Sequence, residues 1–211
     1  MTDQLEIPGV PFPLVPSPAS SWRLDPEAGT VRATAAPHTD LFVDPGSGST
    51  LNAESMLNAA TLLGAAPEGD FQLSARVTVD FAATYDAGVL LIWVDEHHWG
   101  KLCFEFSPAG EPMIVSVVTR GVSDDANAFV VPERSVWLRV SRIDHAYAYH
   151  ASEDGRRWRM IRFFTLGGTE GVPGRELIGL EAQSPTGDGC AVTFEEIRFV
   201  PERLAELRDG S

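Results

Sequence analysis

Alternating apolar and polar residues dominate the chain from residue 70 onward. In residues 71–81, FQLSARVTVDF, every second side chain is apolar. Because strand side chains point alternately to the two faces of a sheet, this pattern predicts a strand with one buried face. Similar runs follow at roughly ten-residue intervals, with turn sequences between them. They are GVLLIWV, WGKLCFEF, PMIVSVVTR, VWLRVSRI, AYAYHAS, WRMIRFFTL, ELIGLEAQS and CAVTFEEIRFV. Repeated strands without intervening helices predict an all-β sandwich or barrel.

The first seventy residues are less regular. Residues 1–21 carry five prolines, which disfavour helix interiors and central strands, so they predict an extended lead-in. Residues 22–35 have the pattern of a hairpin, and residues 37–50 have the Pro, Gly and Ser content of a loop. Residues 52–66, NAESMLNAATLLGAA, fit a helix and a strand equally well, and their periodicity leaves both open.

Turn chemistry separates the later runs. GVSDDANAF at 121–129 and GGTEGVPG at 167–174 are rich in residues that favour turns. Asp154 and Gly155 predict a hairpin, because Asp-Gly readily adopts positive φ. We therefore expect both segments and this dipeptide to connect strands.

The end of the chain departs from strict alternation. Glu195 and Glu196 interrupt the last run and predict a β-bulge. Residues 201–211, PERLAELRDGS, suit a short helix closed by the penultimate glycine. We expect one sandwich domain over 22–200, preceded by the lead-in over 1–21 and followed by this tail.

Composition limits the partners. The chain has 30 acidic and 16 basic residues and a formal net charge of −14. A nucleic-acid backbone requires clustered Lys and Arg, so no nucleic-acid partner is expected. No window reaches the roughly 18 apolar residues of a membrane span, and the first residues lack the features of a signal peptide. Cys103 and Cys190 both lie in apolar runs, which predicts buried free thiols in a reduced, cytoplasmic protein.

Most candidate functional residues lie between residues 89 and 127. In the run WGKLCFEF, Leu102 and Phe104 share one face, whereas Trp99, Lys101 and Glu105 share the other. One face of this strand thus carries two charged residues and a tryptophan, and its other face has the apolar residues expected of a core. This arrangement is typical of a binding face on a β-sheet.

Several segments together resemble a known family. They are WVDEHHWGKLCFEF, VVTRGVSDDAN, VWLRVSRI, HASEDGRRW and AQSPTGDGC, with HTDLF and TYDAGVLL. In the order in which they occur along the chain, from about Trp22 to Phe199, they resemble a family of concanavalin A-like β-sandwiches of unknown function that includes "regulation of enolase" proteins. The resemblance implies a two-sheet antiparallel jelly roll of the lectin/glucanase superfamily, with one curved sheet forming a concave groove. Because relatives occur beside sugar-degradation enzymes, it also implies glycan binding or processing as an analogy.

The sequence departs from the glucanases of that superfamily. Those enzymes carry an acidic triad on alternate residues of one strand, whereas the matching kind of strand here contains Lys101, Cys103 and Glu105. A single carboxylate on this strand does not supply the pair that glycoside hydrolysis requires, so Glu105 would need a second one from Asp86, Asp124 or Asp125 in the loops.

The site hypothesis combines strand and loop residues. Lys101 and Glu105 are about 13 Å apart along a strand, so each requires a partner on a neighbouring strand. Arg120 and Arg139 are candidate partners for Glu105. The hypothesised ligand-binding site comprises Trp99, Lys101, Glu105, Arg120 and Arg139, edged by His38, Asp40, Tyr85, Asp86, Asp124 and Asp125.

Three classes of function remain open. The first is a carbohydrate- or sugar-acid-binding module without a cofactor. The second is a glycosidase or epimerase with Glu105 as acid or base. The third is a structural or partner-binding sandwich, which includes a homodimer. Ca²⁺ binding by Asp124 and Asp125 is an alternative to a solvated turn, because carboxylates in a turn suit a hard cation.

Overall fold

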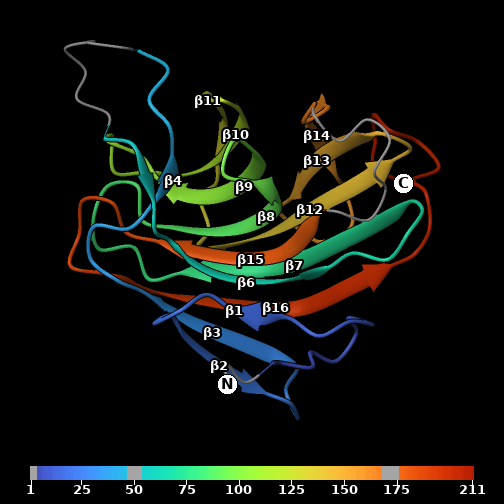
Figure 1. Ribbon diagram of the computed structural model, residues 1–211, viewed down its shortest axis with the longest axis horizontal. Coiled ribbons are helices and arrows are strands. Elements are labelled where there is room, and N and C mark those ends of the chain that lie inside the picture. The colour runs from blue at the N-terminus through green and yellow to red at the C-terminus, as the bar shows by residue number, and fades with distance from the viewer. Residues whose placement is uncertain (1–3, 47–53, 168–175) are drawn as a thin grey trace.

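Two seven-stranded antiparallel sheets pack against each other in the computed structural model (Figure 1), which describes residues 4–46, 54–167 and 176–211. This architecture confirms the predicted two-sheet antiparallel sandwich. The first sheet has the order β1 (Val15–Pro16), β6 (Ala60–Ala65), β15 (Leu177–Gln183), β8 (Ala87–Asp95), β9 (His98–Phe106), β10 (Pro112–Arg120) and β11 (Val122–Val130). The second has the order β14 (Arg159–Phe164), β13 (Ala146–Ser152), β12 (Ser135–Ile143), β7 (Phe71–Val79), β16 (Cys190–Val200), β3 (Thr30–Ala35) and β2 (Ser21–Asp25).

The main core lies between the two sheets. In β7 the apolar alternate residues are buried and the polar ones are only partly covered, as the period-two pattern predicts. Leu102 and Phe104 of β9 join this core. Cys103 and Cys190 are free and buried, as predicted. Among the described residues, no helix is long and apolar enough to span a bilayer.

The ambiguous segment 52–66 forms strands where it is described. Met56–Leu57 is β5, which pairs with the two-residue strand β4 (Leu41–Phe42), and Ala60–Ala65 is β6. Strand β6 lies between β1 and β15, so both of its edges are hydrogen-bonded. Tertiary pairing thus overrides the helical propensity of its Ala and Leu residues.

Residues 121–129 do not form the predicted turn. They lie largely within β11, which pairs with β10 at the edge of the first sheet. The reversal is confined to Gly121, whose φ of 81° is accessible to glycine. Pairing with a long neighbouring strand outweighs the turn preference of the Ser-Asp-Asp sequence. The other predicted glycine-rich connection, 167–174, lies almost entirely outside the described residues.

The predicted short C-terminal helix is wrong. Residues 201–211 form turns, in which the amides of Ala205 and Glu206 both bond to the carbonyl of Ser211. The tail packs on the second sheet, where Arg139 donates to the carbonyl of Gly210 and His150 Nε2 lies 2.8 Å from the carbonyl oxygen of Leu207. An isolated helix of this length is only marginally stable. In addition, Arg139 and His150 contact backbone carbonyl groups of the tail, so these groups have side-chain partners outside a helix.

Three local predictions are confirmed. Residues 22–35 contain the β2–β3 hairpin. Gly155 adopts a φ of 69° in the turn after β13. The β16–β7 pairing shifts between Glu195 and Arg198, and Glu196 has a φ of 50°, which marks the expected bulge.

Gly179 of β15 permits close approach to β6. A Cβ at this position would overlap the backbone carbonyl of Leu62. Gly179→Ala is therefore expected to lower the free energy of unfolding by about 1–3 kcal/mol through overpacking. Urea denaturation followed by tryptophan fluorescence measures this change. A loss below about 0.5 kcal/mol, the range of ordinary surface substitutions, would contradict the close approach.

Candidate functional site

The functional candidates gather on the face of the first sheet that is turned away from the second. Trp99 and Cys103 belong to a second apolar cluster, separate from the main core, together with Val115 and Val117 of β10. Leu41, from β4, packs on this cluster. The segment 39–46 therefore covers part of the sheet face. We call this surface the cavity face.

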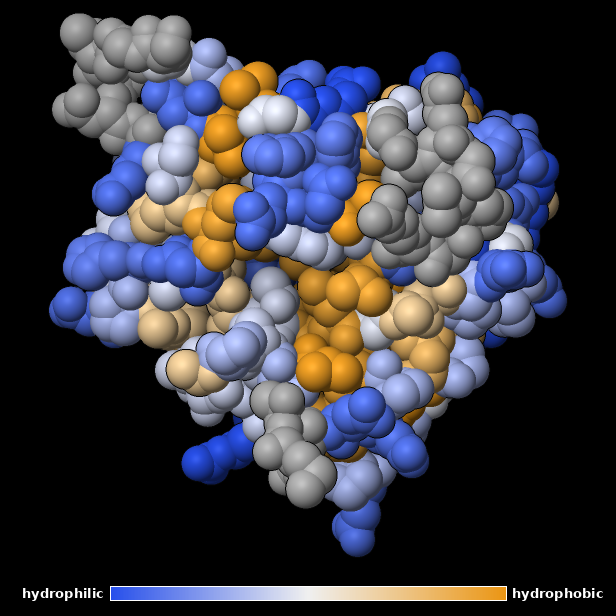
Figure 2. Space-filling model, viewed as in Figure 1, coloured by the Kyte–Doolittle hydropathy of each residue, from blue (hydrophilic) through white to orange (hydrophobic). Residues whose placement is uncertain are grey.

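A cavity of about 470 Å³ opens on the cavity face. Figure 2 shows one side of the molecule, on which a band of apolar residues lies between polar regions. The cavity walls likewise combine apolar and polar side chains. They comprise Asp40, Phe42, Glu54, Met56, Tyr85, Lys101, Glu105, Pro108, Met113, Val117, Asp125, Asn127, Gln183, Pro185 and Thr186.

Lys101 is the central polar group of the cavity and the only lysine of the chain. Its side chain is 2% exposed. The ammonium donates to Asp40 Oδ1 at 2.7 Å and to Gln183 Oε1 at 2.8 Å. Burial by itself lowers the pKa of Lys101, but the charges of Asp40 and Glu181 outweigh burial and raise the pKa above its ordinary value. Lys101 is therefore a buried cation with fixed partners.

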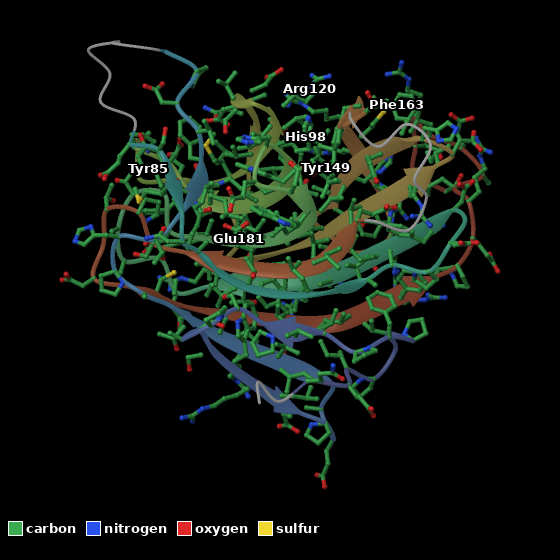
Figure 3. The ribbon with its side chains drawn as sticks, in the orientation of Figure 1. Tyr85, His98, Arg120, Tyr149, Phe163 and Glu181 are labelled. Atoms are coloured by element: carbon green, nitrogen blue, oxygen red, sulfur yellow. The ribbon has the colours of Figure 1, made fainter. Side chains whose placement is uncertain are left out.

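Two glutamates surround this cation without bonding to it. Glu105 lines the cavity and is half-buried, whereas Glu181 of β15 is completely buried in the interior (Figure 3). Among the described residues, neither carboxylate oxygen of Glu181 has a hydrogen-bond partner. Burial raises the pKa of Glu105 and of Glu181 to about 8, although Lys101 opposes the shift. Both side chains are therefore predominantly protonated at pH 7.

The strand register places Asp125 on the cavity face. Lys101 pairs with Val117 of β10, and Val117 pairs with Asp125 of β11. Burial raises the pKa of Asp125. The adjacent Asp124 points to the other face, where Arg162 Nη2 lies 3.2 Å from its carboxylate. The two aspartates therefore cannot share one ion, and the described residues contain no group of three or more His, Cys, Asp and Glu arranged for a metal.

Trp99 and Asp86 lie near the cavity but do not line it. Trp99 is fully buried, and its ring stacks on Trp93 with 6.4 Å between centroids. The Trp99 ring therefore packs beneath the cavity and presents no free face to a ligand. Asp86 is also buried, and its carboxylate accepts bonds from Ser184 Oγ at 2.6 Å and from the amide of Ala82 at 2.8 Å.

The predicted cationic partners of Glu105 lie elsewhere. Arg139 is on β12 of the second sheet, where it contacts the C-terminal tail. Arg120 is exposed at the end of β10, opposite His98 (Figure 3), whereas Glu105 pairs with Met113 near the other end. Alternation fixes the face of a residue on its own strand, but it does not specify which strands are neighbours.

Loop residues divide between the cavity and its surroundings. Asp40 and Tyr85 line the cavity, as the site hypothesis requires. His38 is exposed outside it, with Nδ1 3.3 Å from the carbonyl oxygen of Pro185.

The site hypothesis missed Gln183, Glu181 and the apolar wall. Two signals in the sequence point to part of this set. Lys101 is the sole lysine among 16 basic residues, and Glu181 and Gln183 share one parity in LIGLEAQ. The apolar wall residues Phe42 and Met56 come from a poorly patterned segment, so no periodic signal identifies them.

Comparisons with known proteins agree with this architecture. The chain is 29% identical over 171 residues to "Regulation of enolase protein 1" of Saccharomyces cerevisiae, covering 81% of each protein. The crystal structure of a functionally unknown protein from Saccharomyces cerevisiae matches with a TM-score of 0.71 and 25% identity, covering 87% of this chain and 97% of that one.

A more distant likeness concerns the fold alone. The GH43 BlXynB protein from Bacillus licheniformis matches with a TM-score of 0.69 and 15% identity. The match covers 90% of this chain but 37% of that one. A family model described as "Protein of unknown function (DUF1349)" matches residues 17–202. The chain therefore belongs to the DUF1349 family.

Proposed function

We propose that this protein binds a neutral saccharide in the cavity of the first sheet. The observation that carries the proposal is the convergence of polar side chains beside an apolar wall in one cavity of about 470 Å³. Small-molecule sites are typically concave, roughly 300–1,000 Å³ in volume, and mainly apolar with a few placed polar groups. Saccharide rings combine hydroxyl edges with apolar faces and suit such a lining.

The charge of the lining favours a neutral ligand over a sugar acid. The lining includes the carboxyl groups of Asp40, Glu54, Asp125 and the protonated Glu105, and the only cation among its described residues is Lys101. That ammonium already bonds to two side chains and is almost completely buried. An anionic ligand would face carboxylates without an unpaired cation to receive it.

Particular side chains supply complementary contacts. A protonated Glu105 both donates and accepts hydrogen bonds, and the amide of Asn127 does the same. Phe42 and Met113 offer apolar surface in the same lining, with Met113 paired directly with Glu105 in the strand register. Lys101 donates hydrogen bonds to both Asp40 and Gln183, so these three side chains form a fixed floor of the cavity.

Isothermal titration calorimetry with neutral oligosaccharides and with matched uronic acids tests the proposal. We expect saturable binding of a neutral sugar, weakened about tenfold by Glu105→Ala or Asn127→Ala through the loss of a ligand hydrogen bond. The matched pair Asp125→Asn and Asp124→Asn compares adjacent residues on opposite faces, and only the first should alter affinity. Equal effects of this pair, or no binding across a broad panel, would contradict the proposal.

A second candidate function rests on the raised pKa of Glu105. A carboxylic acid that is still protonated at neutral pH is suited to donate a proton to a leaving group. A sugar-active enzyme using Glu105 as acid would lose turnover in Glu105→Gln while still binding substrate. Its rate would fall as the pH rises through about 8, and a flat profile would exclude this role.

A further inference from the structure

A second recess lies on the outer surface of the second sheet. Its volume is about 310 Å³, and it extends across β2, β3 and β16. Arg23 of β2 and Arg32 of β3 line it and are directly opposite each other in the strand register. Directly opposed residues on antiparallel strands project from the same face, with Cβ atoms about 5 Å apart.

Both arginines lack a counter-charge. Their side chains are exposed, and within 4–46, 54–167 and 176–211 neither makes an ion pair or a side-chain hydrogen bond. The nearest outward carboxylates in the register belong to Asp25 of β2 and Glu195 of β16. Glu195 lies 3.4 Å from Arg76 Nη1, and neither carboxylate pairs with Arg23 or Arg32. Two like charges directly opposite each other are unfavourable, and an anion bound between them would remove this repulsion.

The other lining groups also suit an anion. Ser21, Thr34 and Thr193 contribute hydroxyls, and the described lining contains no carboxylate. This recess therefore contrasts with the acidic cavity on the first sheet and with the net charge of −14. Guanidinium groups bind the oxygens of phosphate and sulfate in bidentate geometry, and hydroxyls complete such a shell.

We infer that Arg23 and Arg32 form a binding site for a tetrahedral oxyanion, a phosphate or sulfate group that is free or carried on a sugar. The two guanidinium groups bind the oxyanion from neighbouring strands, and the hydroxyls of Thr34 and Thr193 donate hydrogen bonds to its remaining oxygens from the sheet surface. This site is separate from the saccharide cavity and does not depend on it.

Titration of the full chain with inorganic phosphate, followed by the arginine Nε–H signals in NMR spectra, tests this inference. Sodium chloride at matched ionic strength corrects for screening. We expect saturable shifts of two arginine signals, and an affinity at least about tenfold lower in Arg23→Gln or Arg32→Gln, as expected for a lost charge-assisted hydrogen bond. Arg156→Gln, which removes an exposed arginine from the turn after β13, is the matched control.

Parallel titrations with sulfate and glucose 6-phosphate identify the source of the group. Tighter binding of the ester through the same arginines supports an oxyanion carried on a sugar, and equal binding supports a free ion. Either result supports the site. Shifts that chloride reproduces, or that Arg156→Gln weakens as much as Arg23→Gln does, would overturn it.

Discussion

Replacing Lys101 with methionine is expected to lower the free energy of unfolding by about 3–5 kcal/mol, the usual cost of removing one partner from a buried ion pair. The substitution matches the length of the aliphatic part of the side chain but removes the ammonium. Asp40 then loses its cation at 2.7 Å, and the amide oxygen of Gln183 loses its donor at 2.8 Å. Urea denaturation at pH 7 measures the loss.

A double-mutant cycle separates this pair from general packing effects. In the Asp40→Asn background, Lys101→Met should cost measurably less, because the partner charge has already been removed. Arg203→Met is the control, since Arg203 pairs with Asp144 at the surface with a side chain that is 52% exposed. Such an exposed pair contributes at most about 1 kcal/mol. A loss in Lys101→Met no larger than this control would refute the buried cluster.

Raising the pH from about 5 to about 9 is expected to destabilise the protein through Glu105 and Glu181. The folded pKa of each is about 8, above the ordinary glutamate pKa of 4.5. Between these values the folded state retains a proton that the unfolded state has released, so rising pH favours unfolding. Below pH 4.5 both states are protonated and the effect vanishes. Above about 8 it is complete, at up to about 5 kcal/mol per group for a shift of this size.

Glu181→Gln should remove much of this pH dependence. The amide is nearly isosteric with the protonated acid and cannot ionise, so the variant should become more stable than the natural protein at pH 9 and similar to it at pH 5. Thermal unfolding at pH 5, 7 and 9 measures the difference. Glu133→Gln, in the exposed turn before β12, provides the control. Parallel pH profiles for the natural protein and Glu181→Gln would show that Glu181 is not buried as a neutral acid.

The sequence predicts the strands and their faces well, because alternation is a local property. The parity of residues 99–106 places Lys101 and Glu105 on one face and Leu102 and Phe104 in the core, as the structure has them. The family resemblance adds the two-sheet architecture. Neither specifies lateral position on a sheet.

Lateral position depends on the order of the strands, which is not consecutive. Strand β15 lies between β6 and β8, although about eighty residues separate it from β8 along the chain. This crossover brings Gln183 to Lys101 and Glu181 close to it. Conversely, Arg139 has the residue type expected for a partner of Glu105 but belongs to the opposite sheet. Local patterning could not distinguish these cases.

Because the single lysine of the chain is buried, its acylation rate can report local opening of the protein. Reagents that acylate amines have one lysine to modify in this chain, and its side chain is 2% exposed and held by two hydrogen bonds. Acylation must await an opening of the segment around Asp40, because the bound ammonium is neither accessible nor nucleophilic. Its rate under native conditions would therefore record how often the floor of the cavity opens, as amide exchange does for backbone hydrogens. A ligand bound over this floor would lower the acylation rate of the lysine without contacting the lysine itself.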